Sequence, residues 1–158
     1  MNKILVIDDD KRIASALAVR LSAAGYEVLT ASDGVQGLKA AVGQKPALII
    51  TDIWMPRPLG FLNHERMQIL GLGAVQVIYI TASKKKDLRQ IAMEEGAAAF
   101  FEKPYNPEEL LSCIACTLAQ RRTREGERPW EPQSHMLAGR HTPSAKQSDL
   151  QLSPTNRA

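Results

Sequence analysis

The sequence has few cysteines, few aromatic residues and no long apolar run. Only 2 of its 158 residues are cysteine, too few for the disulfide framework of a small secreted domain, so we expect a reducing compartment. No stretch reaches the roughly 18 apolar residues that a membrane-spanning helix needs. We do not expect the short apolar run at residues 4–7 to be a secretory signal, because it is far shorter than the apolar region of such signals and acidic residues follow it directly. We therefore expect a cytoplasmic protein without a membrane span.

The low aromatic content and the spacing of the two cysteines bear on the fold. Aromatic residues make up 5% of a chain that is 44% hydrophobic, which favours a core of small aliphatic side chains, as in α/β proteins. Cys113 and Cys116 have the C-x-x-C spacing of redox motifs. Both fall in a strongly helical stretch with no strand and turn before it, so we interpret them as ordinary helix residues.

The charge is unevenly distributed along the chain. Residues 1–119 contain 13 basic and 13 acidic residues, whereas residues 120–158 contain 7 basic and 4 acidic, which accounts for the whole net charge of +3. From Arg121 onward, proline, glycine and serine are scattered and apolar periodicity is almost absent. We predict one domain over residues 1–120 and a disordered basic tail over residues 121–158.

Strand-length apolar runs alternate with helical patterns along the predicted domain. The expected strands are residues 3–8, 26–31, 47–52, 75–81 and 98–103, and the expected helices are residues 12–25, 33–44, 60–70, 85–96 and a last helix from Asn106. Val35, Leu38 and Val42 form the expected apolar stripe of the second helix. Alternating units of this kind predict an α/β fold with a doubly wound, five-stranded parallel sheet and helices on both faces.

Polar residues stand where four of these strands end: Asp8, Asp9, Asp52, Thr81 and Lys103. The carboxyl ends of parallel strands share one edge of the sheet, where ligands bind. Asp8 and Asp9 with Asp52 can hold Mg²⁺, and a free oxygen of Asp52 can attack phosphorus. Thr81 and Lys103 can bind the oxygens of a transferred group. The combination points to phosphoryl transfer.

Four motifs carry a resemblance to a known family: "ILVIDDD", "LIITDIWMP", "YITAS" and "FFEKPY". In their joint spacing, residues 2–119 resemble the receiver domain of two-component response regulators, in particular the chemotaxis regulators. The resemblance implies the strand order 2-1-3-4-5. It implies that Asp52 is the phosphoacceptor and receives its group from a sensor histidine kinase or a phosphotransfer protein. Asp8, Asp9 and the backbone carbonyl of Trp54 would complete the Mg²⁺ site.

The resemblance assigns further roles around this site. Thr81 would be the switch hydroxyl, with Phe100 at the switch-aromatic position, and Lys103 would precede Pro104 in a cis peptide bond. Trp54 and Ser83 occupy the positions that tune dephosphorylation in the family. By contrast, the tripeptide Lys84–Lys86 is expected to be a solvated surface, with a partner-docking role as the alternative.

The loop after Asp52 departs from the family pattern. The family has M-P-x-x-D-G at this point, whereas this chain has "MPRPLG", with Pro58 and with Leu59 in the acidic place. The departure bears on loop shape and partner selectivity but removes none of the phosphoryl-transfer residues.

Two other classes of protein remain as alternatives. A haloacid-dehalogenase-type Mg²⁺-dependent phosphatase has the signature D-x-D-x-[TV]; Asp8 and Asp10 supply D-x-D, but Arg12 stands where Thr or Val belongs. A DNA-binding regulator would need a helix-turn-helix or similar module, which the 39 residues after 119 do not provide. The basic tail could still touch nucleic acid non-specifically. We expect a stand-alone receiver, not an enzyme, that binds a downstream protein and has no specific DNA-binding module.

Overall fold

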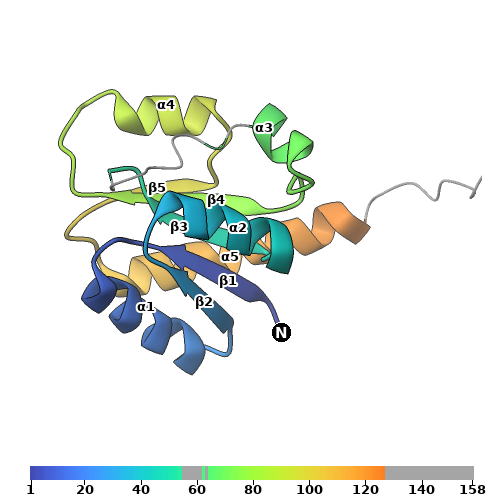
Figure 1. Cartoon of the computed structure of the whole chain (residues 1–158), viewed down its shortest axis with the longest axis horizontal. Coiled ribbons are helices and arrows are strands. Elements are labelled where there is room, and N and C mark those ends of the chain that lie inside the picture. The colour runs from blue at the N-terminus through green and yellow to red at the C-terminus, as the bar shows by residue number, and fades with distance from the viewer. Residues whose placement is uncertain (55–61, 63, 127–158) are drawn as a thin grey trace, which may run out of the picture. The chain divides into compact units, whose positions relative to one another are not determined.

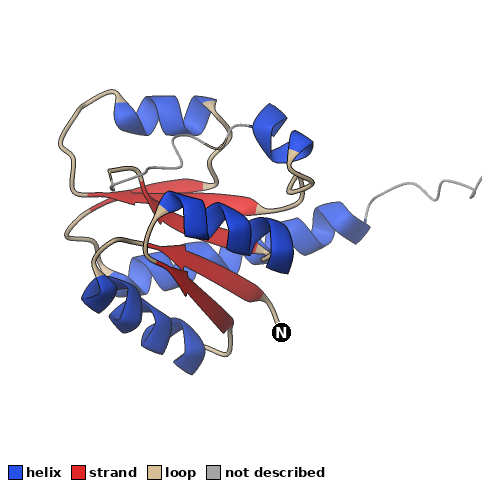
Figure 2. Ribbon diagram, viewed as in Figure 1, coloured by secondary structure: helices blue, strands red, loops and turns tan. Residues whose placement is uncertain are grey.

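The computed structural model describes residues 1–54, 62 and 64–126 of the chain (Figures 1 and 2). Strands and helices alternate along the described residues. In chain order they are β1 (Lys3–Ile7), α1 (Lys11–Ala23), β2 (Glu27–Ala31), α2 (Gly34–Gln44), β3 (Leu48–Asp52), α3 (His64–Ile69), β4 (Gln76–Thr81), α4 (Leu88–Glu94), β5 (Ala99–Glu102) and α5 (Pro107–Gly126).

The strands form one parallel sheet in the order β2-β1-β3-β4-β5, which confirms the predicted doubly wound fold. Because all strands run the same way, their carboxyl ends meet at one edge. The register keeps these ends level: Ile7 pairs with Ala31, and Thr81 pairs with Glu102. Residues that follow the strands are thereby brought to the same side of the molecule.

Helices cover both faces of the sheet, as predicted (Figure 1). On one face, α1 and α5 pack against β1, β3 and β4 through Leu17, Leu21, Leu110 and Ile114. On the other face, α2, α3 and α4 pack through Ala41, Met67, Leu88 and Ala92. Side chains along a strand alternate between these two cores, so both faces of the central strands are apolar. This explains why the central strands are continuous apolar runs in the sequence.

Helix α2 buries only part of the predicted stripe: Leu38 packs against the core, but the two valines do not. Val35 and Val42, expected in the core, are 62% and 41% exposed. The buried residues are Gly34, Gly37 and Ala41. A β-carbon on Gly37 would clash with the side chain of Ile7, including Cγ1 at 2.9 Å. The helix therefore lies close to β1 through its small residues, and its valines face outward.

Helix α3 is shorter than the predicted span of residues 60–70. It begins at His64, and its buried residue is Met67, while Ile69 is 79% exposed. Leu62 is buried, and its backbone N–H donates to the Tyr79 hydroxyl at 2.6 Å. Residues 55–61 and 63, including Pro58 and Leu59, lie outside the described residues.

Helix α5 begins as predicted and extends past the predicted domain boundary. The Oδ1 of Asn106 accepts from the backbone N–H of Glu108 at 2.9 Å, and Pro107 is the first helical residue. Residues 121–126 are helical, and Arg121 Nε donates to the carbonyl of Ala74 at 2.9 Å. That contact holds the final turns against the loop before β4. The remainder of the predicted tail, residues 127–158, lies outside the described residues.

Within residues 1–54, 62 and 64–126, no helix combines the length and the apolar character needed to cross a membrane. Both cysteines lie inside α5, as expected from the sequence.

Candidate phosphoacceptor site

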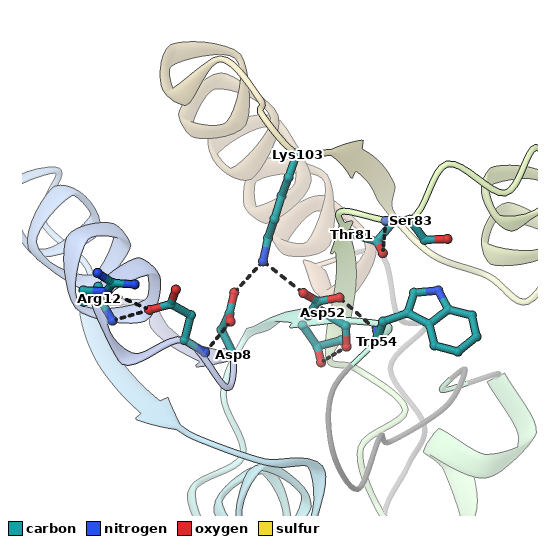
Figure 3. A network of polar contacts seen from close by, with 9 residues as sticks. Asp8, Arg12, Asp52, Trp54, Thr81, Ser83 and Lys103 are labelled. Carbon is teal, nitrogen blue, oxygen red and sulfur yellow. Dashed lines mark hydrogen bonds and ion pairs between the residues drawn. The ribbon is translucent and has the colours of Figure 1, made fainter.

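The polar residues predicted from strand ends do gather at one edge of the sheet (Figure 3). Asp8 follows β1 directly, Asp52 and Thr81 are the last residues of β3 and β4, and Lys103 follows β5. The central strand β3 places Asp52 between the other elements. In the close view, Asp8 lies on one side of Asp52, Thr81 lies on the other, and the Lys103 side chain reaches down between Asp8 and Asp52.

Asp8, Asp9 and Asp52 form a compact carboxylate cluster. One oxygen from each lies within 4.8 Å of the others. Asp8 and Asp52 are buried, with exposed fractions of 6% and 7%, whereas Asp9 is exposed. Three acids so close together repel one another, and their burial increases the cost. The site therefore requires positive charge.

Lys103 supplies part of that charge. Its Nζ lies 2.8 Å from Asp8 Oδ2 and 2.9 Å from Asp52 Oδ2. Burial by itself would lower the pKa of Lys103, but the hydrogen bonds and the charges of the two aspartates outweigh burial and raise the pKa above its ordinary value. Lys103 is thus a cation at neutral pH and bridges the two buried acids.

Backbone amides orient the other oxygens of the same two carboxylates. The Oδ1 of Asp8 accepts from the N–H of Asp10, and the Oδ1 of Asp52 accepts from the N–H of Trp54, each at 2.9 Å. Asp10 itself caps α1, accepting from the N–H of Arg12 at 2.9 Å. Its role is therefore to cap the N-terminus of α1. The loops after β1 and β3 fix the direction of the buried acids before any ligand binds.

Thr81 and Phe100 are both buried beside this edge. Thr81 is 0% exposed, and its Oγ1 accepts from the backbone N–H of Ser83 at 3.1 Å. Phe100 packs in the core beneath α4, and the Arg89 guanidinium lies 5.2 Å from the centre of its ring. The peptide bond between Lys103 and Pro104 is cis, as the resemblance implied.

The lysine run after β4 makes specific contacts that the sequence did not reveal. Lys84 lies 3.5 Å from Glu102 and donates to the carbonyl of Lys103 at 3.3 Å. Lys85 Nζ lies 4.6 Å from the centre of the Trp54 ring. These side chains are exposed, as expected of a solvated surface, yet two of the three bind partners at the site. A single sequence gives no signal for contacts between loops of separate strands.

The donor set fits a magnesium ion. Mg²⁺ prefers oxygen ligands, takes one or two protein carboxylates and keeps several waters. Asp8 and Asp52 present oriented, buried oxygens, and the exposed Asp9 leaves the cluster open to solvent on one side. With its nucleophilic carboxylate, its cation and its hydroxyl, this edge has the parts needed to bind and transfer a phosphoryl group.

Comparison with known proteins identifies the class. Residues 4–115 match the family model of the response regulator receiver domain, and the chain belongs to that family. It is similar to the alkaline phosphatase synthesis transcriptional regulatory protein PhoP of Bacillus subtilis, with 34% identity over 73% of this chain and 48% of PhoP. It is also similar to the DNA-binding dual master transcriptional regulator RpaA of Synechocystis, with 33% identity over 75% of this chain and 49% of RpaA.

Solved structures agree with this assignment. A response regulator receiver domain protein from Clostridium thermocellum has a TM-score of 0.69 and 29% identity, covering 78% of this chain and 99% of that one. The chemotaxis protein CheY4 of Vibrio cholerae has a TM-score of 0.65 and 32% identity, covering 74% of this chain and 98% of CheY4. The family is that of signalling receivers, as the sequence motifs indicated.

One prediction about partners is wrong. We expected no specific DNA-binding module, because the residues after 119 are too few to form one. The relatives, however, are named as transcriptional regulators, and RpaA is named as DNA-binding. The chain spans about half the length of these relatives. The length of this sequence therefore gave no basis for excluding DNA from the function.

Proposed function

We propose that Asp52 is the phosphoacceptor of a Mg²⁺-dependent receiver, loaded from the phosphohistidine of a sensor kinase or phosphotransfer protein. The observation that carries the proposal is the placement of Asp52 within the carboxylate cluster and in contact with Lys103. Loading breaks the P–N bond of the phosphohistidine and forms a bond from an Asp52 oxygen to phosphorus. The histidine of the donor leaves and takes up a proton.

Asp8, Asp9, Asp52 and the backbone carbonyl of Trp54 would hold the ion, which when bound supplies positive charge to the phosphoryl oxygens. Lys103 stands beside the nucleophile and stabilises negative charge on the group being transferred. The N–H of Trp54 orients the Asp52 carboxylate through Oδ1. These residues position and stabilise; Asp52 supplies the electrons that form the new bond.

Thr81 is proposed to couple the loaded site to the surface. Its hydroxyl would donate to a phosphoryl oxygen, which requires the Thr81 side chain to reorient. The backbone N–H of Ser83, which donates to Thr81 Oγ1 in the structure, would then change its acceptor. The loop from Ala82 to Asp87 follows directly. Phe100 would shift with it in the core beneath α4. Trp54 and Ser83 are proposed to set how long the phosphoryl group survives.

The names of the relatives support a transcriptional output as the downstream step. We propose that the phosphorylated receiver regulates transcription, with the receiver spanning residues 1–126 because α5 continues to Gly126. If so, a strain carrying Asp52→Ala should show the transcript changes of a strain that lacks the gene. Transcript levels equal to wild type under all inducing conditions would count against this output.

The proposed loading step is tested with phosphoramidate, a small donor that contains a P–N bond. The 158-residue protein should gain one phosphoryl group by intact mass when Mg²⁺ is present and none when the ion is chelated. Asp52→Ala should gain none, whereas Asp33→Asn, a conservative change at the N-cap of α2, should load like wild type. Equal loading of Asp52→Ala would refute the assignment.

A further inference from the structure

The exposed ring of Trp54 joins two loops at the edge of the site. Trp54 follows β3, and Lys85 lies in the loop between β4 and α4; these two strands are neighbours in the sheet. Trp54 is 54% exposed, an unusual position for so large a ring, and Lys85 Nζ stands 4.6 Å from its centre. A cation at that distance is attracted by the face of the indole.

Trp54 and Lys85 are linked by backbone hydrogen bonds to Asp52 and, through Ser83, to Thr81. Through its backbone N–H, Trp54 holds Asp52 Oδ1 at 2.9 Å. On the other side, the N–H of Lys85 lies 3.5 Å from Ser83 Oγ, and the N–H of Ser83 holds Thr81 Oγ1 at 3.1 Å. Figure 3 shows the indole projecting from Asp52 toward the side of Thr81 and Ser83, away from Lys103. The ring thus lies on the Thr81 side of Asp52, opposite the side from which Lys103 approaches.

We propose that Lys85 is a positioning residue that holds the Trp54 ring at the edge of the site and so restricts access to Asp52. The inference rests on the proposed function of Asp52. Lys85 does not contact the reacting atoms; it acts through Trp54. Its neighbours differ: Lys84 is paired with Glu102, and Lys86 has no ion pair or ring contact with the residues that the structure describes.

Access to Asp52 affects the rate of its loading and the rate of its hydrolysis in the same direction. In loading by acetyl phosphate, an Asp52 oxygen bonds to phosphorus as the bond from phosphorus to the acetate oxygen breaks and acetate leaves. In hydrolysis, a water oxygen bonds to phosphorus as the Asp52–phosphorus bond breaks; inorganic phosphate leaves and the carboxylate is restored. Each reaction needs a clear in-line approach. A restricting ring slows both, whereas a cation that merely attracts an anionic donor speeds only loading.

The experiment compares Lys85→Gln with Lys86→Gln, a matched loss of charge one residue away. Both are made in the 158-residue chain with Trp130→Phe, which leaves Trp54 as the only tryptophan of that sequence. Acetyl phosphate with Mg²⁺ gives the loading rate, and decay after donor removal gives the hydrolysis rate. We expect Lys85→Gln to raise both by about two- to five-fold, the factor that corresponds to an exposed cation–π contact. Lys86→Gln should leave both unchanged.

Two further variants separate positioning from charge. Lys85→Arg keeps a cation that stacks on indole and should retain the slow rates. Trp54→Asn, with the original Lys85, should shorten the phosphorylated lifetime, and adding Lys85→Gln to it should have no further effect. Quenching of Trp54 fluorescence by acrylamide, measured without any donor, should increase in Lys85→Gln but not in Lys86→Gln.

Any other result would contradict the proposed role of Lys85. Slower loading with unchanged decay in Lys85→Gln would make Lys85 a donor-binding residue. Unchanged rates, or unchanged quenching, would show that Lys85 does not hold the ring. If the parent protein failed to load at all, the proposed function would fall together with the inference, whereas normal loading with equal rates in both variants would overturn the role of Lys85 alone.

Discussion

The ammonium of Lys103 lies 2.9 Å from Oδ2 of Asp52, although 51 positions separate the two residues in the sequence. The same ammonium contacts Asp8 Oδ2 at 2.8 Å. One side chain from the loop after β5 therefore ties together the ends of β1 and β3.

Lys103→Met should destabilise the protein, because it leaves two buried carboxylates facing each other without a cation. We expect a loss of about 1–3 kcal/mol in the free energy of unfolding, the usual cost of leaving buried polar groups unpaired. Urea unfolding in the presence of a chelator measures it. Lys103→Met combined with Asp52→Asn should recover part of the loss, because the repulsion is then removed. Additive effects of the two changes would contradict the contact.

Removing one carboxylate should weaken Mg²⁺ binding. Trp54 adjoins Asp52, so its fluorescence should respond to Mg²⁺ in the Trp130→Phe protein. We expect Asp9→Asn to weaken the apparent affinity roughly tenfold or more. Asp10→Asn is the matched control, because Asp10 caps α1 and asparagine caps equally well. Equal affinities in the two variants would place the ion elsewhere.

Thr81→Ala should load normally yet lose the response of the following loop. The phosphoryl group goes to Asp52, so the Thr81 hydroxyl is not needed to receive it. In wild type, loading should change the hydrogen exchange of the Ser83 amide, which donates to Thr81 Oγ1. The change should be absent in Thr81→Ala and present in Thr81→Ser, which retains the hydroxyl. A full response in Thr81→Ala would remove Thr81 from the coupling.

The buried phenol of Tyr79 should make the protein less stable to unfolding at alkaline pH. Burial raises the pKa of the Tyr79 phenol from 10.0 to about 12. The unfolded chain loses this proton near pH 10 and the folded chain only near pH 12, so stability is full below pH 10 and falls as the pH rises through this window. The fall attributable to Tyr79 is roughly 2–3 kcal/mol.

The control for this prediction is Tyr79→Phe, which lacks the phenol but keeps every lysine that also titrates at alkaline pH. At neutral pH this variant should lose about 0.5–1.5 kcal/mol, because the N–H of Leu62 loses its acceptor. Urea unfolding below pH 10 and again near pH 12 should show that the difference between the two proteins shrinks or reverses at the higher pH. A constant difference would mean that the phenol is not buried in solution.

The strands and the strand-end residues could be predicted from the sequence, for a physical reason. A strand covered on both faces must be apolar throughout, so β1, β3 and β4 stand out as continuous runs. Parallel pairing then brings Asp8, Asp52 and Lys103 to one edge without further information. Local signals also located the start of the last helix at Asn106.

The features that could not be predicted depend on contacts between residues that are far apart in the sequence, not on local sequence pattern. The buried face of α2 could be predicted only in part, because the valine stripe is the more apolar one and only the close approach of Gly37 to Ile7 turns the valines outward. The extent of α5 depends in part on Arg121 reaching Ala74. The contact between Lys85 and Trp54 joins two loops whose proximity exists only in the folded chain. Such contacts leave no periodic trace in one sequence.

The central claim, that Asp52 accepts the phosphoryl group, is tested most directly by locating the modification. The 158-residue protein is loaded with acetyl phosphate and Mg²⁺ and then treated with borohydride, which reduces an aspartyl phosphate to homoserine. Peptide mass spectrometry should find homoserine at position 52 alone, and none when Mg²⁺ is chelated. Homoserine at Asp8 or Asp9, or a phosphoryl group that is present on the protein while position 52 remains aspartate, would contradict it.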